Sequence, residues 1–180
     1  ADFMKVAFAD KGIRENVKYR TIDSTISPYM TAERYQESTK TKRKKSVYRD
    51  DLLCEVERYG EEAGQIAKEE NFQVIHAHDW LSFPAGMAAK KASKKPIVLH
   101  VHATEYDRCH ELGVNPGIVA IEKKGLLAAD KVIAVSNYTK NRIVKYYGID
   151  KNKIEVVHNG IQKELRERYK NRVTISKIKS

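Results

Sequence analysis

Short apolar segments alternate with longer segments of helical periodicity between residues 73 and 157, and this alternation limits the fold more than any other feature. The expected strands cover residues 73–78, 96–102, 131–135 and 153–157, and the expected helices cover residues 82–92, 117–129 and 137–147. Near-continuous apolar strands separated by helices are typical of βαβ crossovers, which give a parallel sheet covered on both faces. The sequence therefore predicts the α/β class, as a Rossmann-like three-layer fold around a parallel sheet.

Local signals support these elements. The apolar residues between Leu52 and Ile66 recur at alternating spacings of four and three, which predicts a further helix ahead of the alternation. Ser136 directly follows an expected strand and is suited to cap the next helix, and Gly148 is suited to end that helix in the left-handed conformation.

The first 48 residues carry weaker signals. Residues 3–9 and 17–22 are rich in apolar or β-branched residues and are predicted as strands. Residues 23–48 show no sustained period, and we expect a long loop with helical pieces there.

The net charge of +10 comes largely from two clusters, one at Lys40–Lys45 and one in the tail at Lys163–Lys179. Solvated surface explains both, and no aromatic stacking platform is interleaved with the first cluster, so no nucleic-acid partner is expected. A non-catalytic module that binds polyanions through Lys40–Lys45 stays open as an alternative, and its signature is an affinity that falls steeply with salt.

The sequence shows neither a membrane-spanning apolar run nor a secretory leader, so the expected compartment is the cytoplasm. Cys54 and Cys109 have no metal-binding or disulfide spacing and are interpreted as core thiols.

Polar side chains follow two neighbouring strands. One strand ends in HAHDW from His76 and the next in HVHATEYDR from His100. Because side chains alternate along a strand, His76 and His78 point one way, as do His100 and His102, and we expect the four imidazoles to converge at one sheet edge. His76 and His100, deeper in their strands, are interpreted as satisfied core or supporting residues.

A metal-dependent hydrolase that uses these histidines is a second alternative, since HxH on a strand supplies two zinc ligands in several enzymes. The spacing argues against it, because Asp79 directly follows His78 whereas the HxHxDH pattern needs a residue between them and a further His. No metal is therefore expected. The helix start near Asn137 faces the same edge and suits an anionic or hydroxyl-rich ligand, although the phosphate-binding glycine motifs are absent.

Four segments, together about half of the chain, resemble a known family in order and spacing. They are NFQVIHAHDWLSFPAGMAAKK, KKPIVLHVHATEYDR, IEKKGLLAADKVIAVSNYTKNRIVKYYG and DKNKIEVVHNGI. They are similar to the N-terminal domain of family 4 glycosyltransferases, the retaining group with the GT-B fold that includes bacterial and archaeal glycogen synthases. The resemblance implies transfer of a hexose from a nucleoside diphosphate sugar to a carbohydrate or other hydroxyl acceptor.

Site residues follow from the same resemblance. His102 matches the family histidine beside the transferred sugar, and Asp79 matches the aspartate that orients the acceptor hydroxyl, so both are expected to be catalytic. The substrate-binding residues that it implies are His78, Trp80, Glu105, Asp107, Arg108, Ser136, Asn137, Asn159 and Gly160. Core packing is an equally good interpretation of Trp80.

The sequence also departs from the family pattern. Residues 1–160 are expected to form the acceptor-side domain without its usual first strand and glycine-rich loop, and residues 161–180 an interdomain crossover or a basic tail. The donor-binding domain, with its two glutamates seven residues apart, is not found in the sequence. An excised or naturally truncated piece is expected, which binds no cofactor, is inactive alone and pairs with a second copy through its exposed sheet edge.

Overall fold

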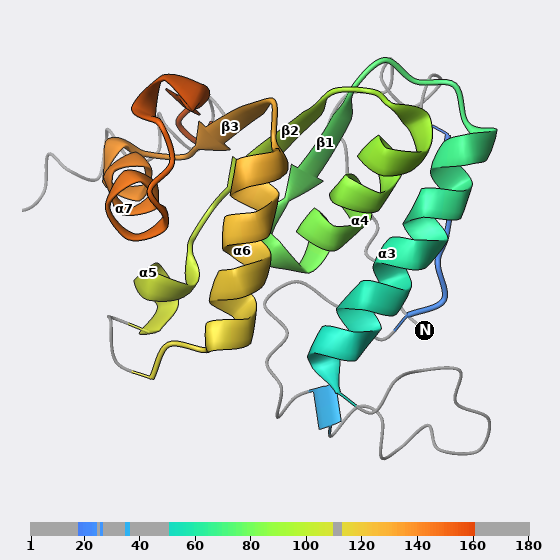
Figure 1. The fold of residues 1–180 in the computed structure, drawn as a ribbon, viewed down its shortest axis with the longest axis horizontal. Coiled ribbons are helices and arrows are strands. Elements are labelled where there is room, and N and C mark those ends of the chain that lie inside the picture. Colours follow the sequence, from blue (N-terminus) through green and yellow to red (C-terminus); the bar gives the residue numbers. More distant parts are fainter. Residues whose placement is uncertain (1–17, 25, 27–34, 37–50, 110–112, 161–180) are drawn as a thin grey trace, which may run out of the picture.

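The computed structural model describes residues 18–24, 26, 35–36, 51–109 and 113–160. Within these ranges the chain forms a four-stranded sheet in which every neighbouring pair of strands is parallel (Figure 1). The strands, in their spatial order, are β1 (Ile75–His78), β2 (Ile97–Val101), β3 (Lys131–Ala134) and β4 (Ile154–Val156). The predicted α/β class with a parallel sheet is confirmed.

The predicted helices are also present, with boundaries shifted by a few residues. They are α3 (Leu52–Glu69), α4 (Asp79–Ser93), α6 (Pro116–Ala128) and α7 (Asn137–Tyr147). The largest shift is in α4, which begins at Asp79, directly after β1, rather than at residue 82. Two short elements were not predicted, α5 (Glu105–Cys109) and the 3₁₀ turn η1 (Lys151–Lys153), because each is too short to show a periodic pattern.

Side-chain caps fix the starts of two helices. The carboxylate of Asp51 accepts a hydrogen bond from the Cys54 N–H at 2.8 Å before α3. The hydroxyl of Ser136 accepts one from the Thr139 N–H at 3.0 Å before α7, and Gly148 follows α7 with a φ of 69°. Both predicted ends of α7 are confirmed.

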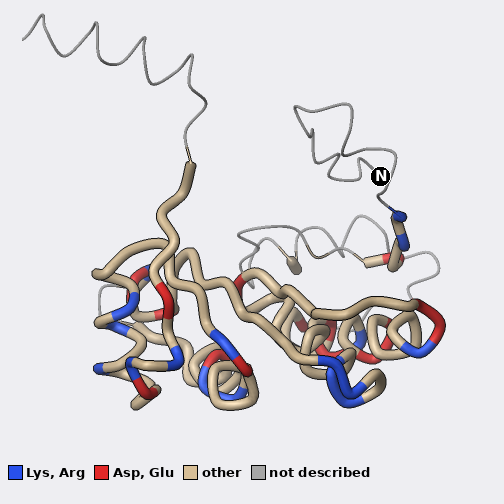
Figure 2. The backbone as a smooth tube through the Cα atoms, turned by 90° about the horizontal axis from the view of Figure 1, so that it is seen from above, with Lys and Arg blue, Asp and Glu red and all other residues tan. Residues whose placement is uncertain are grey.

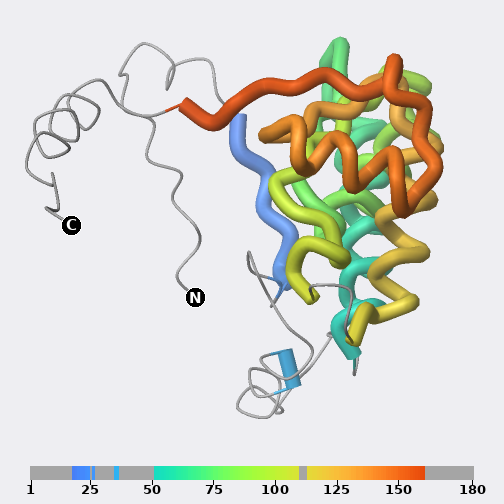
Figure 3. The backbone as a smooth tube through the Cα atoms, turned by 90° about the vertical axis from the view of Figure 1, so that its left-hand side faces the viewer, coloured from blue at the N-terminus to red at the C-terminus, as the bar shows by residue number. Residues whose placement is uncertain are grey.

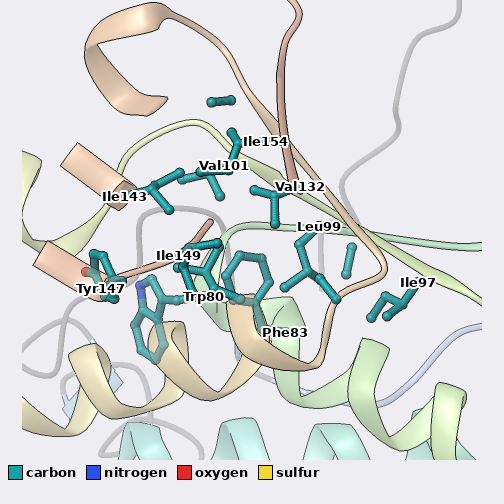
Figure 4. Close-up of a cluster of buried hydrophobic side chains, with 14 of the residues drawn as sticks. Trp80, Phe83, Ile97, Leu99, Val101, Val132, Ile143, Tyr147, Ile149 and Ile154 are labelled. Carbon is teal, nitrogen blue, oxygen red and sulfur yellow. The ribbon is translucent and has the colours of Figure 1, made fainter. Parts of the chain in front are cut away.

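The helices that connect the strands, α4, α6 and α7, pack on one face of the sheet. Strand order follows chain order, and right-handed crossovers that always step in the same direction place every connecting helix on the same side. The β2 side chains of Ile97, Leu99 and Val101 are buried on this face. The helices cover them with a set of buried side chains that includes Leu126. Phe83, Ile143 and Tyr147 belong to the same set (Figure 4).

Two glycines allow this close approach. A Cβ atom on Gly86 of α4 would lie 2.7 Å from Cδ1 of Ile97, and one on Gly125 of α6 would lie 2.9 Å from Cδ2 of Phe83. Both distances are shorter than van der Waals contact, so the helices sit against the core with no space for a larger residue.

The opposite face of the sheet, here called the histidine face, carries His76, His78, Val98, His100 and Ile133. Its two β1 histidines are exposed, and the other three side chains are half-buried. Within the described ranges no helix lies over this face. The histidines of β1 and β2 therefore lie on the face that these helices leave uncovered.

Residues 18–24 run alongside α3, which in turn packs against α4 (Figure 1). Lys18 and Arg20 form ion pairs with Glu70 at 2.7 and 2.5 Å, and the Ser24 hydroxyl donates to Glu55 at 2.8 Å. Residues 18–22 are not in a strand, so that part of the prediction for residues 17–22 is wrong. Side-chain contacts to α3 replace the ladder that the β-branched residues suggested.

Several predictions fall outside the described residues: the strand at 3–9, most of the loop at 23–48, the Lys40–Lys45 cluster and the tail beyond Gly160. Along the described ranges, basic and acidic residues are interspersed on the helices (Figure 2). Seen from the side, α3 and α6 lie on one side of the molecule and the chain after β4 runs away from them (Figure 3). None of the described helices has the length and apolar character required to cross a bilayer.

Candidate functional site

Four histidines form a continuous row across β1 and β2, here called the imidazole row: His76, His78, His100 and His102. The parallel register places the Cα of His78 opposite the Cα of His100. Ring centroids are 4.4 Å apart for His76 and His78, 4.7 Å for His78 and His100, and 4.5 Å for His100 and His102. The predicted convergence of the imidazoles is confirmed.

His76 and His100 are not satisfied core residues, so that part of the interpretation is wrong, and their supporting role stays a prediction. His76 is exposed, because its side chain lies on the histidine face, which no helix covers within the described ranges. His100 is half-buried, and neither of its ring nitrogens has a hydrogen-bond partner among the described residues. The sequence pattern could not reveal this, because it does not show that α4, α6 and α7 all pack on the other face.

His78 and His102 touch at the end of the row. Nδ1 of His78 and Nε2 of His102 are 3.2 Å apart, a distance at which one ring donates a hydrogen and the other accepts it. Although the His78 side chain is exposed overall, partial burial of its ring lowers its pKa below the usual value, and the neighbouring His76 and His102 contribute in the same direction. At neutral pH, His78 is therefore a neutral ring that can fix the tautomer of His102.

His100 is the most strongly perturbed ring. Burial, together with the adjacent His102 and His78, lowers its pKa to about 4. The ring is therefore neutral at physiological pH and retains a free lone pair. Ring nitrogens of His76, His78 and His100 lie within 4.8 Å of one another, which makes these three the candidates for holding a metal ion.

Asp79 joins β1 to the end of β2. Its Oδ1 atom accepts a hydrogen bond from the backbone N–H of His102 at 2.8 Å. To reach it, Asp79 adopts a φ of 58°, a left-handed conformation that costs about 1 kcal/mol for a residue with a Cβ. The Ser82 hydroxyl donates to the His78 carbonyl at 2.6 Å and holds the same turn. Asp79 and His102 are thus brought together at the carboxyl edge of the sheet.

Trp80 points away from this edge. Its side chain is 5% exposed and belongs to the core with Phe83, Val101 and Ile143 (Figure 4). Burial favours the packing interpretation over an exposed platform for a substrate.

Glu105, Asp107 and Arg108 lie on α5 and bond to the elements beside it. Arg108 pairs with Glu105 at 3.0 Å and with Glu122 of α6 at 2.8 Å. Asp107 accepts from the Thr104 N–H at 2.7 Å and lies 2.6 Å from Arg142 of α7. These contacts secure α5, and the structure does not join these three residues to the imidazole row.

Glu122 is the residue of this region that sequence reasoning missed. It accepts from the Glu105 N–H at 3.0 Å, from Arg108 and from the Tyr147 hydroxyl, and it is 2% exposed. Burial raises the pKa of its carboxyl, although the hydrogen bonds oppose that shift. Its place four residues after Ile118 and four before Leu126, on the apolar stripe of α6, was the available signal.

The remaining predicted residues lie after β3 and β4. Ser136 caps α7, and Asn137 is exposed in the first turn of that helix. Asn159 and Gly160 are exposed at the end of the described chain. Nδ1 of His158 lies 3.0 Å from the Val135 carbonyl and ties the segment after β4 to the end of β3. All follow the carboxyl ends of strands, where ligands bind in open parallel sheets.

The edge of the sheet thus combines the neutral imidazoles of His78 and His100, the carboxylate of Asp79 and the start of a capped helix. Neutral imidazoles and a carboxylate donate and accept hydrogen bonds without demanding a charged ligand, which suits a hydroxyl-rich molecule.

Comparison with known proteins identifies a family and several similar proteins. Residues 43–165 match the family model described as Glycosyltransferase Family 4. The chain is 31% identical over 94 residues to an uncharacterized glycosyltransferase of Methanocaldococcus jannaschii, covering 51% of this chain and 24% of that protein. It is 34% identical over 96 residues to the alpha-maltose-1-phosphate synthase of Mycobacterium tuberculosis, covering 51% and 25%. It is 26% identical over 108 residues to D-inositol 3-phosphate glycosyltransferase 1 of Catenulispora acidiphila, covering 57% and 26%. The matched segments span about a quarter of each relative.

Proposed function

This chain belongs to glycosyltransferase family 4, and we propose that it forms the acceptor side of an enzyme that moves a hexose from a nucleoside diphosphate sugar to a hydroxyl acceptor with retention of configuration. The relatives named above support glycosyl transfer. The single observation that carries the proposal for this chain is the contact of His102 with both Asp79 and His78 at the carboxyl edge of the sheet.

His102 is the proposed catalytic residue. Its Nε2 faces Nδ1 of His78, so Nδ1 is the ring nitrogen left to a sugar. When His78 donates to Nε2, the other nitrogen of His102 carries the hydrogen and donates to a sugar hydroxyl. A donor held in place before the reaction stabilises charge as it develops in the transition state, without further reorganisation.

Asp79 acts on this histidine and on the acceptor. One carboxylate oxygen of Asp79 accepts a hydrogen bond from the His102 backbone, which helps to position the His102 ring at the end of β2. We propose that the second oxygen orients the acceptor hydroxyl for attack, since placing a nucleophile contributes strongly to such reactions. The donor would be held by a second domain that the shared quarter of the relatives does not include.

We propose that the reaction takes place in the cytoplasm, because the sequence holds two cysteines with no disulfide spacing, a pattern that is usual in that compartment.

The test uses the complete enzyme with a panel of nucleoside diphosphate hexoses, α-glucan and phosphorylated polyol acceptors. Release of nucleoside diphosphate gives kcat/KM, and NMR of the product gives its anomeric configuration. His102→Ala is expected to lower kcat/KM by about 10²- to 10³-fold, the effect of removing one transition-state donor. Lys151→Ala, an exposed change in η1, is the matched control and should leave activity unchanged. Near-normal activity of His102→Ala, or a product of inverted configuration, contradicts the proposal.

A further inference from the structure

We propose that His76, His78 and His100 bind a divalent transition-metal ion of the zinc class on the histidine face. Their ring nitrogens lie within 4.8 Å of one another, and among the described residues this is the group of potential ligands that meets this spacing. Three imidazoles that leave a further coordination position open are a known zinc-binding pattern. This inference does not depend on the proposed glycosyl transfer.

The backbone holds the three rings in place. His76 and His78 alternate along β1 on the same face, and His100 is the Cα partner of His78 on β2. Parallel pairing of the two strands fixes this register. The rings of His76 and His100 lie within 6° of parallel, and the ring of His78 is tilted by 38° and 32° from them, so all three imidazoles have to turn to share one ion.

Turning the rings has to bring the three nitrogens closer together. Three atoms that lie 4.8 Å from one another, the upper limit for this group, have a common centre about 2.8 Å from each, whereas a zinc–nitrogen bond is about 2.0–2.1 Å. Each ring nitrogen therefore has to move by roughly 0.7 Å. Rotation about the terminal side-chain torsion of histidine, which is soft, supplies a movement of this size without shifting the strands.

His100 supplies the second and independent observation. Both of its ring nitrogens are buried, and neither has a hydrogen-bond partner among the described residues. An imidazole in that state leaves polar atoms unsatisfied, which costs about 1–3 kcal/mol and requires an explanation. A metal ion supplies the missing partner for one of these nitrogens.

His78 links the metal to His102. Ligating histidines commonly donate their second ring hydrogen to a supporting acceptor, and Nδ1 of His78 faces Nε2 of His102 at 3.2 Å. His78 can therefore bind the ion through Nε2 and donate through Nδ1. The sequence lacks the HxHxDH motif, which needs a further histidine on the segment of His76 and His78. The site proposed here takes its third ligand, His100, from the neighbouring strand instead.

The experiment measures Zn²⁺ binding by calorimetry to the chain produced without a polyhistidine tag, and repeats it with Co²⁺, whose visible spectrum reports coordination geometry. We expect one ion per chain with micromolar or tighter affinity and a tetrahedral Co²⁺ spectrum. His76→Ala and His100→Asn should each weaken binding at least about 100-fold, since loss of a mere supporting partner already costs about 10- to 100-fold.

His158→Ala is the matched control, an exposed histidine outside the group, and should bind normally. Because His76 is exposed, His76→Ala keeps the test valid if His100→Asn fails to fold. The absence of binding, several equivalent weak sites, or unchanged affinity in folded His76→Ala overturns the proposal.

Discussion

Replacing Asp79 separates the cost of its backbone conformation from the value of its hydrogen bond. Asp79 has a φ of 58° and accepts from the His102 N–H at 2.8 Å. Asp79→Asn keeps an acceptor and tolerates the left-handed conformation, so it should cost less than about 1 kcal/mol, mostly from the charge lost at the start of α4. Asp79→Ala loses the hydrogen bond and retains the strain, and should cost about 2–3 kcal/mol.

Asp79→Gly loses the same hydrogen bond but relieves about 1 kcal/mol of strain, so it should cost about 1–2 kcal/mol and fall between the other two. Lys94 supplies the control, because it ends α4 with a φ of 61° while its N–H bonds to the Lys90 carbonyl at 2.9 Å. Lys94→Gly keeps this backbone hydrogen bond, and should therefore stabilise the chain by about 1 kcal/mol.

Urea denaturation followed by the fluorescence of Trp80 measures these differences. Trp80 is the single tryptophan of the chain, is 5% exposed and directly follows Asp79. The expected order of stability is wild type, Asn, Gly and Ala. If Gly is no more stable than Ala while Lys94→Gly stabilises, the strain assigned to Asp79 is wrong. If Asn is as unstable as Ala, the hydrogen bond to His102 is not what the side chain contributes.

Two further predictions concern the core and the acid response. Gly86→Ala should destabilise the chain by about 1–2 kcal/mol in denaturant titrations, because overpacking against Ile97 exceeds the gain in helix propensity; an increase in stability would contradict the packing described. His100 has a folded-state pKa of about 4, below that of the unfolded chain. Its contribution to the free energy of unfolding is therefore fully present above about pH 6.5 and is lost as the pH falls towards 4. With chelator present, stability should fall by about 1–2 kcal/mol over that window, a value reduced for solvent screening, and His100→Val should remove this part of the pH dependence. An identical pH profile for the two proteins would show that His100 is not responsible.

Patterns that depend on neighbours along the chain were enough to predict most of the described fold. The apolar runs that became β1 to β4 and the periodic stripe of α3 follow from the alternation of side chains in strands and helices. The same alternation predicted that His76, His78, His100 and His102 would meet.

Properties that depend on the assembled sheet were not predictable in the same way. The exposure of His76 and the unpartnered ring of His100 result from three crossovers in one direction, which only the strand order reveals. The hydrogen bond from the His102 backbone to Asp79 requires a positive φ that no sequence pattern marks for an aspartate. The α5 residues were expected at the site from the family resemblance. Their contacts with Glu122 were not predicted, because they depend on how α5 and α6 pack.

The order of the strands also bears on how the domain folds. Each strand pairs with the next one along the chain, with partners such as Ile75 and Ile97 or Val132 and Ile154. Contacts between nearby segments lose little chain entropy on closing, so this sheet can grow by one βα unit at a time as the polypeptide emerges. The imidazole row needs only β1, α4 and β2. It is therefore expected to form when the first βαβ unit closes, before α7 packs on the sheet.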